Sequence, residues 1–418
     1  MTKILIVGGG GREHAIAWKF SQSGKDVQLY CAPGNGGIAQ VAQCVDIAAT
    51  DVDGIVKWAK DNTMDMVFVA PDDPLAMGMV DALEAAGIRA FGPTKAAAEI
   101  EWSKAYSKDL MKKYGIPTAE YAVFDDAAAA REYLETARLP LVVKADGLAL
   151  GKGVLICETK EDALQAVDQI MVQKEFGGAG NRIVIEEFMT GPEVSVLTFT
   201  DGKTILPMLA AQDHKRAYDN DEGKNTGGMG TFCPTPKYTP AIQAAVERDI
   251  FQKTVDALNA EGRPFKGVIF FGLMLTADGP KVLEYNARLG DPEVQSVFML
   301  LENDLCDIVD AVIDETLDKV ELQWKDGSAV CVVMASGGYP EKYEKGKEIS
   351  GLGDVDGDVM VFHAGTANKD GAIVTSGGRV LGVTATGADI AQARKKAYAN
   401  VEKIHFEDAQ YRSDIGIK

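Results

Sequence analysis

The first hundred residues alternate short apolar runs with longer amphipathic segments. The runs KILIV, VQLYCA, MVFVA and IRAFGP predict four strands, and the segments REHAIAWKFSQSG, VDGIVKWAKDN and PLAMGMVDALEAAG between them predict three helices. Strands that alternate with helices in this way are typical of a doubly wound parallel sheet. We therefore expect an α/β domain at the N-terminal end of the chain.

The next two hundred residues follow a different pattern, with shorter strands and other turn signals. A helical segment, SKAYSKDLMKKYG, precedes the predicted strands PLVVKADG, GVLIC and RIVIEEF, which surround the helix EDALQAVDQIMVQ. The predicted strands EVSVLTFTDG and TILPMLA follow. A long helix over about 239–260 then leads to KGVIFFGLMLTADGPKVLEYNAR, which predicts a β-hairpin.

Strand and helix signals resume after a charged, turn-prone segment around residues 324–327. SAVCVVMAS and RVLGVTATG predict strands, and ADIAQARKKAYANV predicts the last helix. The chain therefore reads as a multidomain α/β and α+β protein in three parts. These are an N-terminal doubly wound parallel α/β domain over 1–103, a central domain over 104–325 and a small C-terminal α/β domain over 326–418.

Charge and cysteine usage narrow the possible partners. The net charge of −19 argues against a general nucleic-acid or membrane-surface partner, since both need a cationic face. The six cysteines include no Cys-x-x-Cys pair, which is typical of a reduced, cytosolic protein and makes a zinc site or disulfide framework unexpected. No apolar run reaches membrane-spanning length, and a strand begins almost at once. We expect a cytoplasmic protein without a targeting segment.

The opening glycines resemble a dinucleotide fingerprint but depart from it in two places. Gly8 and Gly10 fit, but Glu13 stands at the third glycine position. The second strand ends in CAP, without the carboxylate that would bind ribose hydroxyls. This favours a single phosphate or carboxylate at the helix start over a dinucleotide. The alternative is a tight turn with no ligand.

A second glycine-rich stretch, KADGLALGKGV, is not a Walker A loop, because Asp146 stands at the first glycine position and Gly153 replaces Ser or Thr. Its flanking strands predict a hairpin that could cover phosphates. The glycines free the backbone and the lysines supply charge: Lys144, Gly147, Gly151, Lys152 and Gly153. A β-turn with surface lysines is the alternative.

The next strand ends in Glu186, Glu187 and Phe188, where a linker between two lobes could present backbone groups to a purine edge. Glu193 follows a few residues later, suitably placed for ribose hydroxyls. Paired glutamates at a strand end are also common on solvated surfaces, so both interpretations stand.

The stretch KVLEYNARLGDPE carries the clearest chemistry. Side chains alternate along a strand, so Glu284, Asn286 and Arg288 are expected to share one face. Leu283, Tyr285 and Ala287 would share the opposite face. A carboxylate and an amide oxygen are hard ligands suited to Mg²⁺, and the arginine could neutralise a transferring phosphoryl group. The alternative is a solvated polar face.

A polar loop, AQDHKRAYDNDEGKNTGGMG, is the last candidate. Asp213, His214, Lys215 and Arg216 crowd together ahead of a glycine-rich turn. Such polar density in a loop suggests ligand binding. His214 could be a general base or part of a cationic anchor, and nothing in the sequence requires a covalent enzyme intermediate.

Together these stretches resemble the glycinamide ribonucleotide synthetase (phosphoribosylamine–glycine ligase) family of the ATP-grasp superfamily. The resemblance covers essentially the whole chain, from GGGGREHA through QDHKR, NTGGMG and EYNARLGDPE to the closing DIG. It implies that ATP, glycine and 5-phosphoribosylamine give glycinamide ribonucleotide, ADP and phosphate through glycyl phosphate, in purine synthesis. It also implies that the central part is an ATP-grasp domain with a mobile flap subdomain at about 119–190.

The resemblance also implies residue roles. Lys104, Lys144 and the 147–153 flap would contact ATP phosphates, Glu186 to Phe188 would flank adenine, and Glu193 would bind the ribose. Glu284 and Asn286 would hold Mg²⁺ or Mn²⁺, and Arg288 would stabilise the acyl-phosphate step. The candidates for the glycine and phosphoribosylamine sites are Gly10, Gly11, Asp213, Lys215, Arg288, Gly290 and Asp291. Of these, Asp213, Lys215 and Arg288 would be catalytic.

Two departures from the family pattern stand out. Asp72 occupies a position where many members have glutamate, so its role is open. VIFFGLMLT lacks the acidic metal ligand that many ATP-grasp enzymes carry on this strand, so phosphates and water would complete the coordination. Rival interpretations are another ATP-grasp ligase such as a biotin carboxylase, an oxidoreductase, or a non-catalytic nucleotide-binding module. We expect a monomer.

Overall fold

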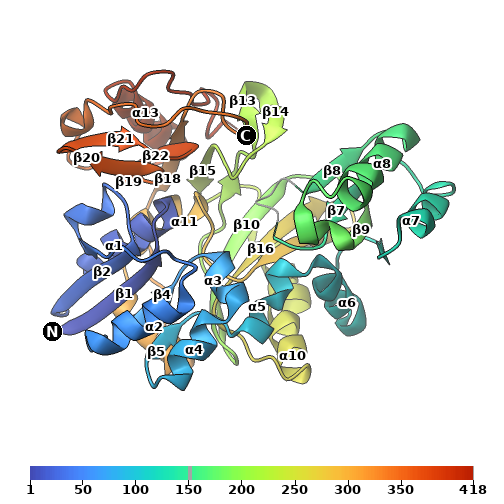
Figure 1. Cartoon of the computed structure of the whole chain (residues 1–418), viewed down its shortest axis with the longest axis horizontal. Coiled ribbons are helices and arrows are strands. Elements are labelled where there is room, and N and C mark those ends of the chain that lie inside the picture. Colours follow the sequence, from blue (N-terminus) through green and yellow to red (C-terminus); the bar gives the residue numbers. More distant parts are fainter. Residues whose placement is uncertain (149–152, 418) are drawn as a thin grey trace.

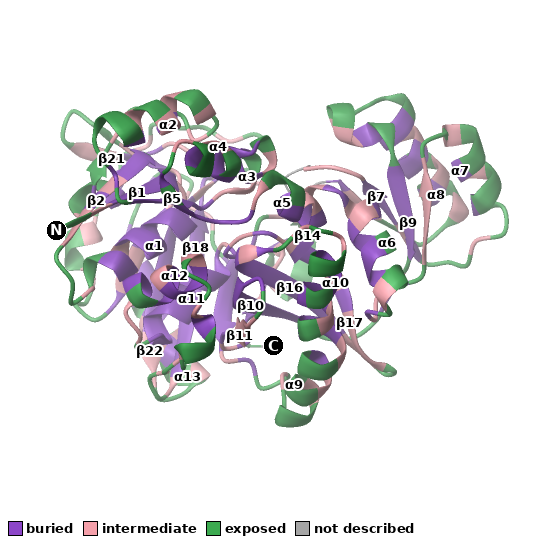
Figure 2. Ribbon diagram, turned by 90° about the horizontal axis from the view of Figure 1, so that it is seen from below, coloured by how far each residue is buried: buried purple, intermediate pink, exposed green. Residues whose placement is uncertain are grey.

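The structure is a computed structural model that describes residues 1–148 and 153–417 (Figure 1). Three parts pack against one another, and a lobe built from residues of the central part projects from them at the right of Figure 1. Most strands are buried, whereas the outer faces of the covering helices are exposed (Figure 2). Within the described residues, no helix is both long and apolar enough to span a membrane.

The N-terminal part is a five-stranded parallel sheet in the order β3-β2-β1-β4-β5, which confirms the predicted doubly wound sheet. Its strands are β1 Thr2–Gly8, β2 Val27–Pro33, β3 Gln43–Cys44, β4 Met66–Val69 and β5 Arg89–Phe91. Its helices are α1 Gly11–Ser21, α2 Val52–Asp61, α3 Asp72–Met77 and α4 Met79–Ala85. The single helix predicted over PLAMGMVDALEAAG is wrong, because Gly78 adopts φ +90° and divides it into α3 and α4.

The central part contains an antiparallel sheet in the order β11-β10-β16-β17. Its strands are β10 Glu193–Asp201, β11 Ile205–Pro207, β16 Lys266–Thr276 and β17 Gly279–Asn286. Strands β16 and β17 form the predicted hairpin. The helices are α5 Lys95–Trp102, α6 Lys104–Tyr114, α9 Pro240–Val246 and α10 Gln252–Ala260, and a wider helical turn joins the last two, as the long predicted helix requires.

The projecting lobe has its own antiparallel sheet, in the order β6-β9-β7-β8, and its own hydrophobic cluster. Its elements are β6 Tyr121–Phe124, α7 Ala127–Leu134, β7 Leu141–Ala145, β8 Val154–Cys157, α8 Lys160–Val167 and β9 Ile183–Glu187. Strands β7 and β8 pair antiparallel, which confirms the predicted hairpin around the second glycine-rich stretch. Two hydrophobic clusters each combine residues of the N-terminal and central parts, whereas the C-terminal sheet and the lobe each have a separate cluster.

The C-terminal part is built on the sheet β12-β15-β18-β22-β19, which α13 Ile390–Val401 covers. Its strands are β12 Gln212–Asp213, β15 Gly230–Cys233, β18 Ser328–Ala335, β19 Met360–His363 and β22 Arg379–Gly387. Two of these strands, β12 and β15, precede residue 326, so the sheet draws on both sides of that predicted boundary. Short hairpins, β13 Arg216–Tyr218 with β14 Glu222–Asn225 and β20 Thr366–Lys369 with β21 Ala372–Thr375, complete this region. Helix α11 Glu293–Leu300 packs between this sheet and α1, and α12 Leu305–Ile313 packs on β10 and β16.

Candidate functional site

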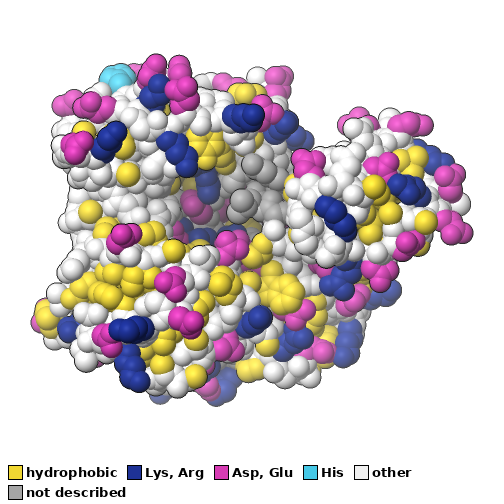
Figure 3. All heavy atoms as spheres, viewed as in Figure 1, with side chains coloured by type: hydrophobic (Ala, Val, Ile, Leu, Met, Phe, Trp, Pro, Cys, Tyr) yellow, Lys and Arg dark blue, Asp and Glu magenta, His cyan; other side chains and the backbone are white. Residues whose placement is uncertain are grey.

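A hollow between the projecting lobe and the rest of the molecule contains the predicted site, and basic and acidic side chains line it (Figure 3). Glu284, near the end of β17, is the carboxylate on which the charges of the predicted site converge. Burial alone would raise the pKa of this carboxyl, but Lys215, Lys144, Lys104 and Arg288 lower it. Four cations that are far apart in sequence therefore converge on one carboxylate.

Lys144 reaches the hollow from β7 in the lobe. Its Nζ lies 2.9 Å from Glu186 Oε2, and Lys108 Nζ lies 3.0 Å from the same oxygen. Burial would raise the pKa of Glu186, but the two lysines lower it, and burial lowers the pKa of Lys108 to about 8. Sequence analysis missed Lys108, although it lies four residues from Lys104 and therefore on the same face of α6. Glu187 is exposed and Phe188 half-buried at the end of β9.

Lys104 is the first residue of α6, where the Ser103 hydroxyl caps the helix by accepting a hydrogen bond from the Tyr106 N–H. Its Nζ donates to the Gly147 carbonyl at 3.0 Å, which joins the helix to the hairpin of the lobe. A Cβ on Gly147 would lie 2.6 Å from Ala179 Cβ, so this close approach requires glycine. Gly153 is buried, whereas the predicted contacts Gly151 and Lys152 lie outside the described residues.

The alternation predicted for β17 is wrong at one residue. The register shifts beside Gly272 and Leu273, which pair with Glu284 and Val282 and leave Leu283 as an extra residue. Val282, Tyr285 and Ala287 consequently join one hydrophobic cluster, and Leu283 packs against another. Glu284 and Asn286, which lie after the bulge, are both half-buried.

Asn286 and Arg288 share a buried partner that sequence analysis missed. Glu101 Oε1 accepts a hydrogen bond from Asn286 Nδ2 at 3.1 Å and lies 3.0 Å from Arg288 Nη2. Burial would lower the pKa of Arg288, but Glu101, Asp72 and other acidic neighbours raise it. Asp72, at the first turn of α3, belongs to this cluster: burial would raise its pKa, and Arg288 and Arg12 lower it.

The loop after β12 supplies the next groups. Lys215 Nζ lies 2.9 Å from Glu193 Oε2 and 3.9 Å from Glu284 Oε1, and Glu193 is the main cause of its raised pKa. Asp213 Oδ1 accepts a hydrogen bond from the His214 N–H at 2.7 Å. Burial, and then Glu293, raise the pKa of Asp213 well above its ordinary value. The predicted Asp213, Lys215 and Glu193 therefore line one side of the hollow.

His214 does not fit either of its predicted roles. The side chain is fully buried and packs against Phe232, and its Nε2 accepts a hydrogen bond from the Gly416 N–H at 3.4 Å. The ring therefore lies in the interior near the C-terminal tail, away from solvent. The alternation of side chains along the short strand β12 and its continuation places Asp213 and Lys215 on the opposite side.

Asp291 lies where the N-terminal and C-terminal parts meet. Its carboxylate accepts hydrogen bonds from Gln295 Nε2 at 2.7 Å and Arg379 Nη2 at 3.1 Å. Burial would raise its pKa, but Arg379 and Arg12 lower it. A Cβ on Gly11 would lie 3.4 Å from Asp291 Oδ1, and one on Gly10 would lie 3.8 Å from Oδ2. Gly290 precedes Asp291 and is buried.

The opening glycine turn has an internal partner. Glu13 Oε2 accepts a hydrogen bond from the Gly10 N–H at 2.6 Å, and Arg12 Nε lies 2.7 Å from Glu13 Oε1. The residue at the third fingerprint position thus places a carboxylate against the turn, where a dinucleotide phosphate would need the backbone N–H group. This arrangement disfavours the oxidoreductase interpretation.

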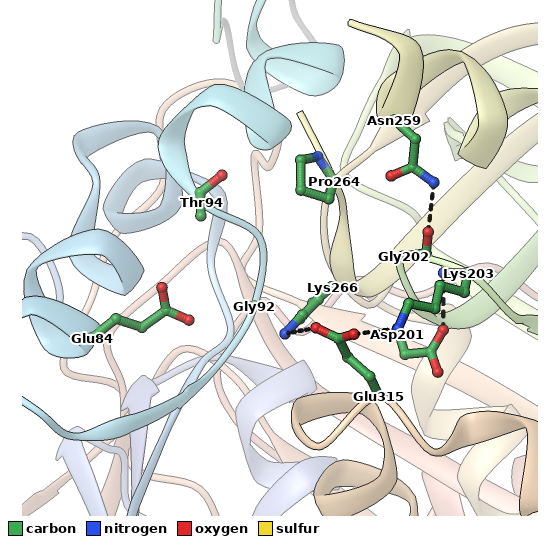
Figure 4. A pocket seen from close by; sticks show the side chains of 10 residues that line it. All are labelled: Glu84, Gly92, Thr94, Asp201, Gly202, Lys203, Asn259, Pro264, Lys266 and Glu315. Atoms are coloured by element: carbon green, nitrogen blue, oxygen red, sulfur yellow. Dashed lines mark hydrogen bonds and ion pairs between the residues drawn. The ribbon is translucent and has the colours of Figure 1, made fainter. Parts of the chain in front are cut away.

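A separate groove of about 460 Å³ lies between the N-terminal part and the central sheet (Figure 4). Four of its charged side chains have partners: Glu315 binds Lys203 and Lys266, and Asp201 accepts hydrogen bonds from backbone N–H groups. Figure 4 shows Glu315 between the two lysines. We assign no function to this groove.

The donor chemistry of the hollow suits a hard divalent cation. Glu284 offers a carboxylate, and Asn286 donates its Nδ2 to Glu101, which leaves its amide oxygen for another partner. A glycine-rich hairpin with lysines lies on one side of the site, and a strand with a carboxylate, an amide and an arginine lies on the other. This arrangement is that of an ATP-grasp, nucleotide-dependent enzyme.

The comparisons give the family. The models of the phosphoribosylglycinamide synthetase N domain, ATP-grasp (A) domain and C domain match residues 2–101, 102–294 and 329–418. A phosphoribosylamine–glycine ligase from Rhodopirellula baltica is 50% identical over 99% of this chain and 97% of its own. A crystal structure of the Thermotoga maritima ligase aligns with a TM-score of 0.87 and 35% identity, covering 99% of this chain and 100% of that one. The chain belongs to the phosphoribosylglycinamide synthetase family and is an ATP-grasp ligase that forms a C–N bond.

The rival carboxylase interpretation shares only the fold. The biotin carboxylase domain of the Hydrogenobacter thermophilus 2-oxoglutarate carboxylase, in complex with MgADP, aligns with a TM-score of 0.75 at 15% identity over 98% of this chain and 91% of that one. At this identity the likeness shows the common ATP-grasp architecture. The full-length family match separates the chain from carboxylases and from non-catalytic modules.

Proposed function

We propose that the hollow around Glu284 carries out the ligation of this family: ATP, glycine and 5-phosphoribosylamine give glycinamide ribonucleotide, ADP and phosphate. The observation that supports this site is the convergence of Lys104, Lys144, Lys215 and Arg288 on one carboxylate. Glycyl phosphate is the intermediate, because a glycine carboxylate is a poor electrophile until it is phosphorylated. The amine of phosphoribosylamine then attacks the activated carbonyl.

Positioning and charge neutralisation carry most of this chemistry. Lys104, Lys144 and the hairpin residues Gly147 to Gly153 bind the ATP phosphates. Arg288 stabilises the charge that develops as the phosphoryl group transfers and acyl phosphate forms. No side chain of the site needs to form a covalent bond to substrate.

Glu284 and Asn286 would hold Mg²⁺ or Mn²⁺ through their side-chain oxygen atoms, which are hard ligands of the kind that these ions prefer. The ion neutralises phosphate charge when it is bound. Glu186, Glu187 and Phe188 lie beside adenine, and Glu193 binds the ribose. Lys215, which is ion-paired with Glu193, lies at the border between the nucleotide and the second substrate.

The amino-acid and sugar substrates bind on the other side of Arg288. Asp213, Lys215, Gly290 and Asp291 contact glycine and phosphoribosylamine, and Gly10 and Gly11 approach the sugar phosphate. The closeness of Gly11 to Asp291 supports one continuous substrate site between the N-terminal turn and the β17 end. Asp72 completes this region through its charge interaction with Arg288.

Three expectations accompany this function. The enzyme works as a monomer in the cytoplasm, the lobe at about 119–190 moves as a flap, and its partners are small molecules, with no nucleic acid and no membrane. The separate hydrophobic cluster in the lobe supports its motion as a unit.

Coupled ADP release tests the proposal. The enzyme is supplied with ATP and Mg²⁺, and glycine and freshly generated phosphoribosylamine are added separately and then together. Release only with both substrates is the expected result. Release with formate or bicarbonate and a later purine intermediate instead would keep the fold and overturn the substrate assignment.

A further inference from the structure

Glu101, on helix α5 where the N-terminal part meets the central part, connects that helix to the end of strand β17. It lies one residue before the end of α5, is buried, and has no place among the residues that the family resemblance suggested. Its Oε2 accepts a hydrogen bond from the Ala287 N–H at 2.7 Å. Its Oε1 accepts from Asn286 Nδ2 at 3.1 Å and lies 3.0 Å from Arg288 Nη2. One carboxylate therefore binds three consecutive residues just where β17 ends.

The contact with Asn286 determines which end of the amide faces the hollow. An ionised carboxylate only accepts hydrogen bonds, so only the NH₂ end of the amide can face it. Because the amide is planar, Oδ1 then points away from Glu101. The metal needs an oxygen, so the orientation of this amide decides whether Asn286 is a ligand.

The contact with Arg288 holds one edge of its guanidinium group in place. Nη2 faces Glu101 and Nη1 donates to the Leu289 carbonyl at 3.2 Å. The buried Nε has no hydrogen-bond partner among the residues that the structure describes. Glu101 and the Leu289 carbonyl thus hold one terminal nitrogen each, and the buried Nε–H is left for another group.

We propose that Glu101 is a positioning residue for the ligation: it orients Asn286 Oδ1 toward the metal and the Arg288 guanidinium toward the reacting phosphoryl group. This inference rests on the proposed function for the identity of the reaction. Glu101 itself touches neither substrate nor metal. Groups that orient metal ligands in this way typically change metal affinity or activity by about 10- to 100-fold when they are replaced.

The conservative variant Glu101→Gln separates positioning from packing, because it keeps the size of the side chain but adds an NH₂ group. That group cannot face the NH₂ of Asn286, so one of the two amides must turn. If the Asn286 amide turns, its Oδ1 faces residue 101 and its NH₂ faces the metal. Glu101→Asp keeps an acceptor with a shorter reach.

The experiment measures Mn²⁺ binding by EPR in the presence of ADP, together with kcat, KM for glycine and the midpoint of thermal unfolding. Glu101→Gln is expected to weaken Mn²⁺ binding by about 10-fold or more and to lower kcat more than it raises KM for glycine. Glu101→Asp should retain part of the affinity. Glu99→Gln is the matched control, because Glu99 lies on the same helix and pairs with Arg263 away from the hollow, and it should bind Mn²⁺ like the wild type.

A double-mutant cycle with Asn286→Ala completes the test. In the Asn286→Ala background, Glu101→Gln should have little further effect on Mn²⁺ binding. Wild-type Mn²⁺ affinity and kcat in a folded Glu101→Gln variant would overturn the proposal. The proposal would also be overturned if Glu101→Gln and Glu101→Asp lost Mn²⁺ affinity equally and in proportion to their lowered unfolding midpoints. Additive effects of the two substitutions in the cycle would overturn it as well. If Glu101→Gln does not fold, the same cycle is measured with Glu101→Asp in its place, alone and combined with Asn286→Ala, and the same criteria apply.

The metal-binding readout keeps this inference distinct from the substrate assignment. Failure of ADP release with glycine and phosphoribosylamine would overturn the proposed function but would leave the Mn²⁺ result to decide the role of Glu101.

Discussion

Two regions of this molecule concentrate charge, and they differ in how that charge is balanced. In the groove of Figure 4, Glu315 binds Lys203 and Lys266, and three backbone N–H groups bind Asp201. In the hollow of Figure 3, buried and half-buried cations surround Glu284 and Glu186, yet Glu186 Oε1 and Arg288 Nε have no hydrogen-bond partner among the described residues.

The difference shows that charge density alone does not identify a site. A buried polar atom without a partner costs free energy, so a fold keeps one where a ligand supplies the partner or the chemistry needs it. The groove has a volume of about 460 Å³, but four of its charged side chains already have partners within the protein. The hollow carries unsatisfied groups, and it is where we propose that the family's chemistry takes place.

The largest effect expected from this comparison is on turnover. Arg288→Ala should lower kcat by about 10³-fold or more, because the arginine acts on charge that develops in the transition state. ATP binding, measured by calorimetry, should change little. Lys266→Ala in the groove is the control and should keep kcat within about twofold. Wild-type turnover in Arg288→Ala would contradict the assignment.

A smaller effect is expected on stability. Lys108→Met leaves the buried Glu186 carboxylate with Lys144 alone, and the loss of one partner of a buried ion pair costs about 3–5 kcal/mol in the free energy of unfolding. Lys203→Met removes an exposed partner of Glu315 and should cost much less than Lys108→Met. Urea unfolding measures both, and equal costs would show that the two charge clusters do not differ in burial.

The smallest effect is expected on stability at low pH. Lys203 and Lys266 lower the pKa of Glu315 from its ordinary 4.5 to about 2. A lowered carboxyl pKa stabilises the folded state above pH 4.5, and this contribution is lost as the pH falls toward 2. The excess stability of the wild type over Glu315→Gln should be below about 1 kcal/mol at pH 6, because the pairs are exposed, and should shrink between pH 5 and pH 3.

Chemical unfolding of the two proteins across this pH range checks the prediction. A difference that stays constant between pH 5 and pH 3 would contradict it. Turnover at neutral pH should be the same in both, since the groove lies outside the hollow.

Much of the fold was predictable because it depends on local patterns. The parallel N-terminal sheet, the β16–β17 hairpin and the β7–β8 hairpin all follow from apolar runs and turn residues. The break at Gly78 and the bulge at Leu283 were missed. Both are backbone adjustments within otherwise regular patterns, and both depend on what packs against the segment.

The candidate site was predictable in part for a similar reason. Glu284, Asn286, Lys144 and Asp213 stand in motifs whose residue types indicate their chemistry. Arg379, which contacts Asp291 from the C-terminal part, and Glu101 stand in segments without such a signal. Lys108 carried a weak signal through its helical spacing from Lys104.

The sequence by itself determined the family and the three-part organisation, and it supplied most of the candidates that we propose bind nucleotide and metal. Only the tertiary structure decided how these groups are held: Glu101 binds Asn286 across 185 residues of chain, and Arg379 binds Asp291 across 88. The physical reason is that periodicity and motifs report on neighbours along the chain. The partner of a buried charge depends instead on which segments pack together.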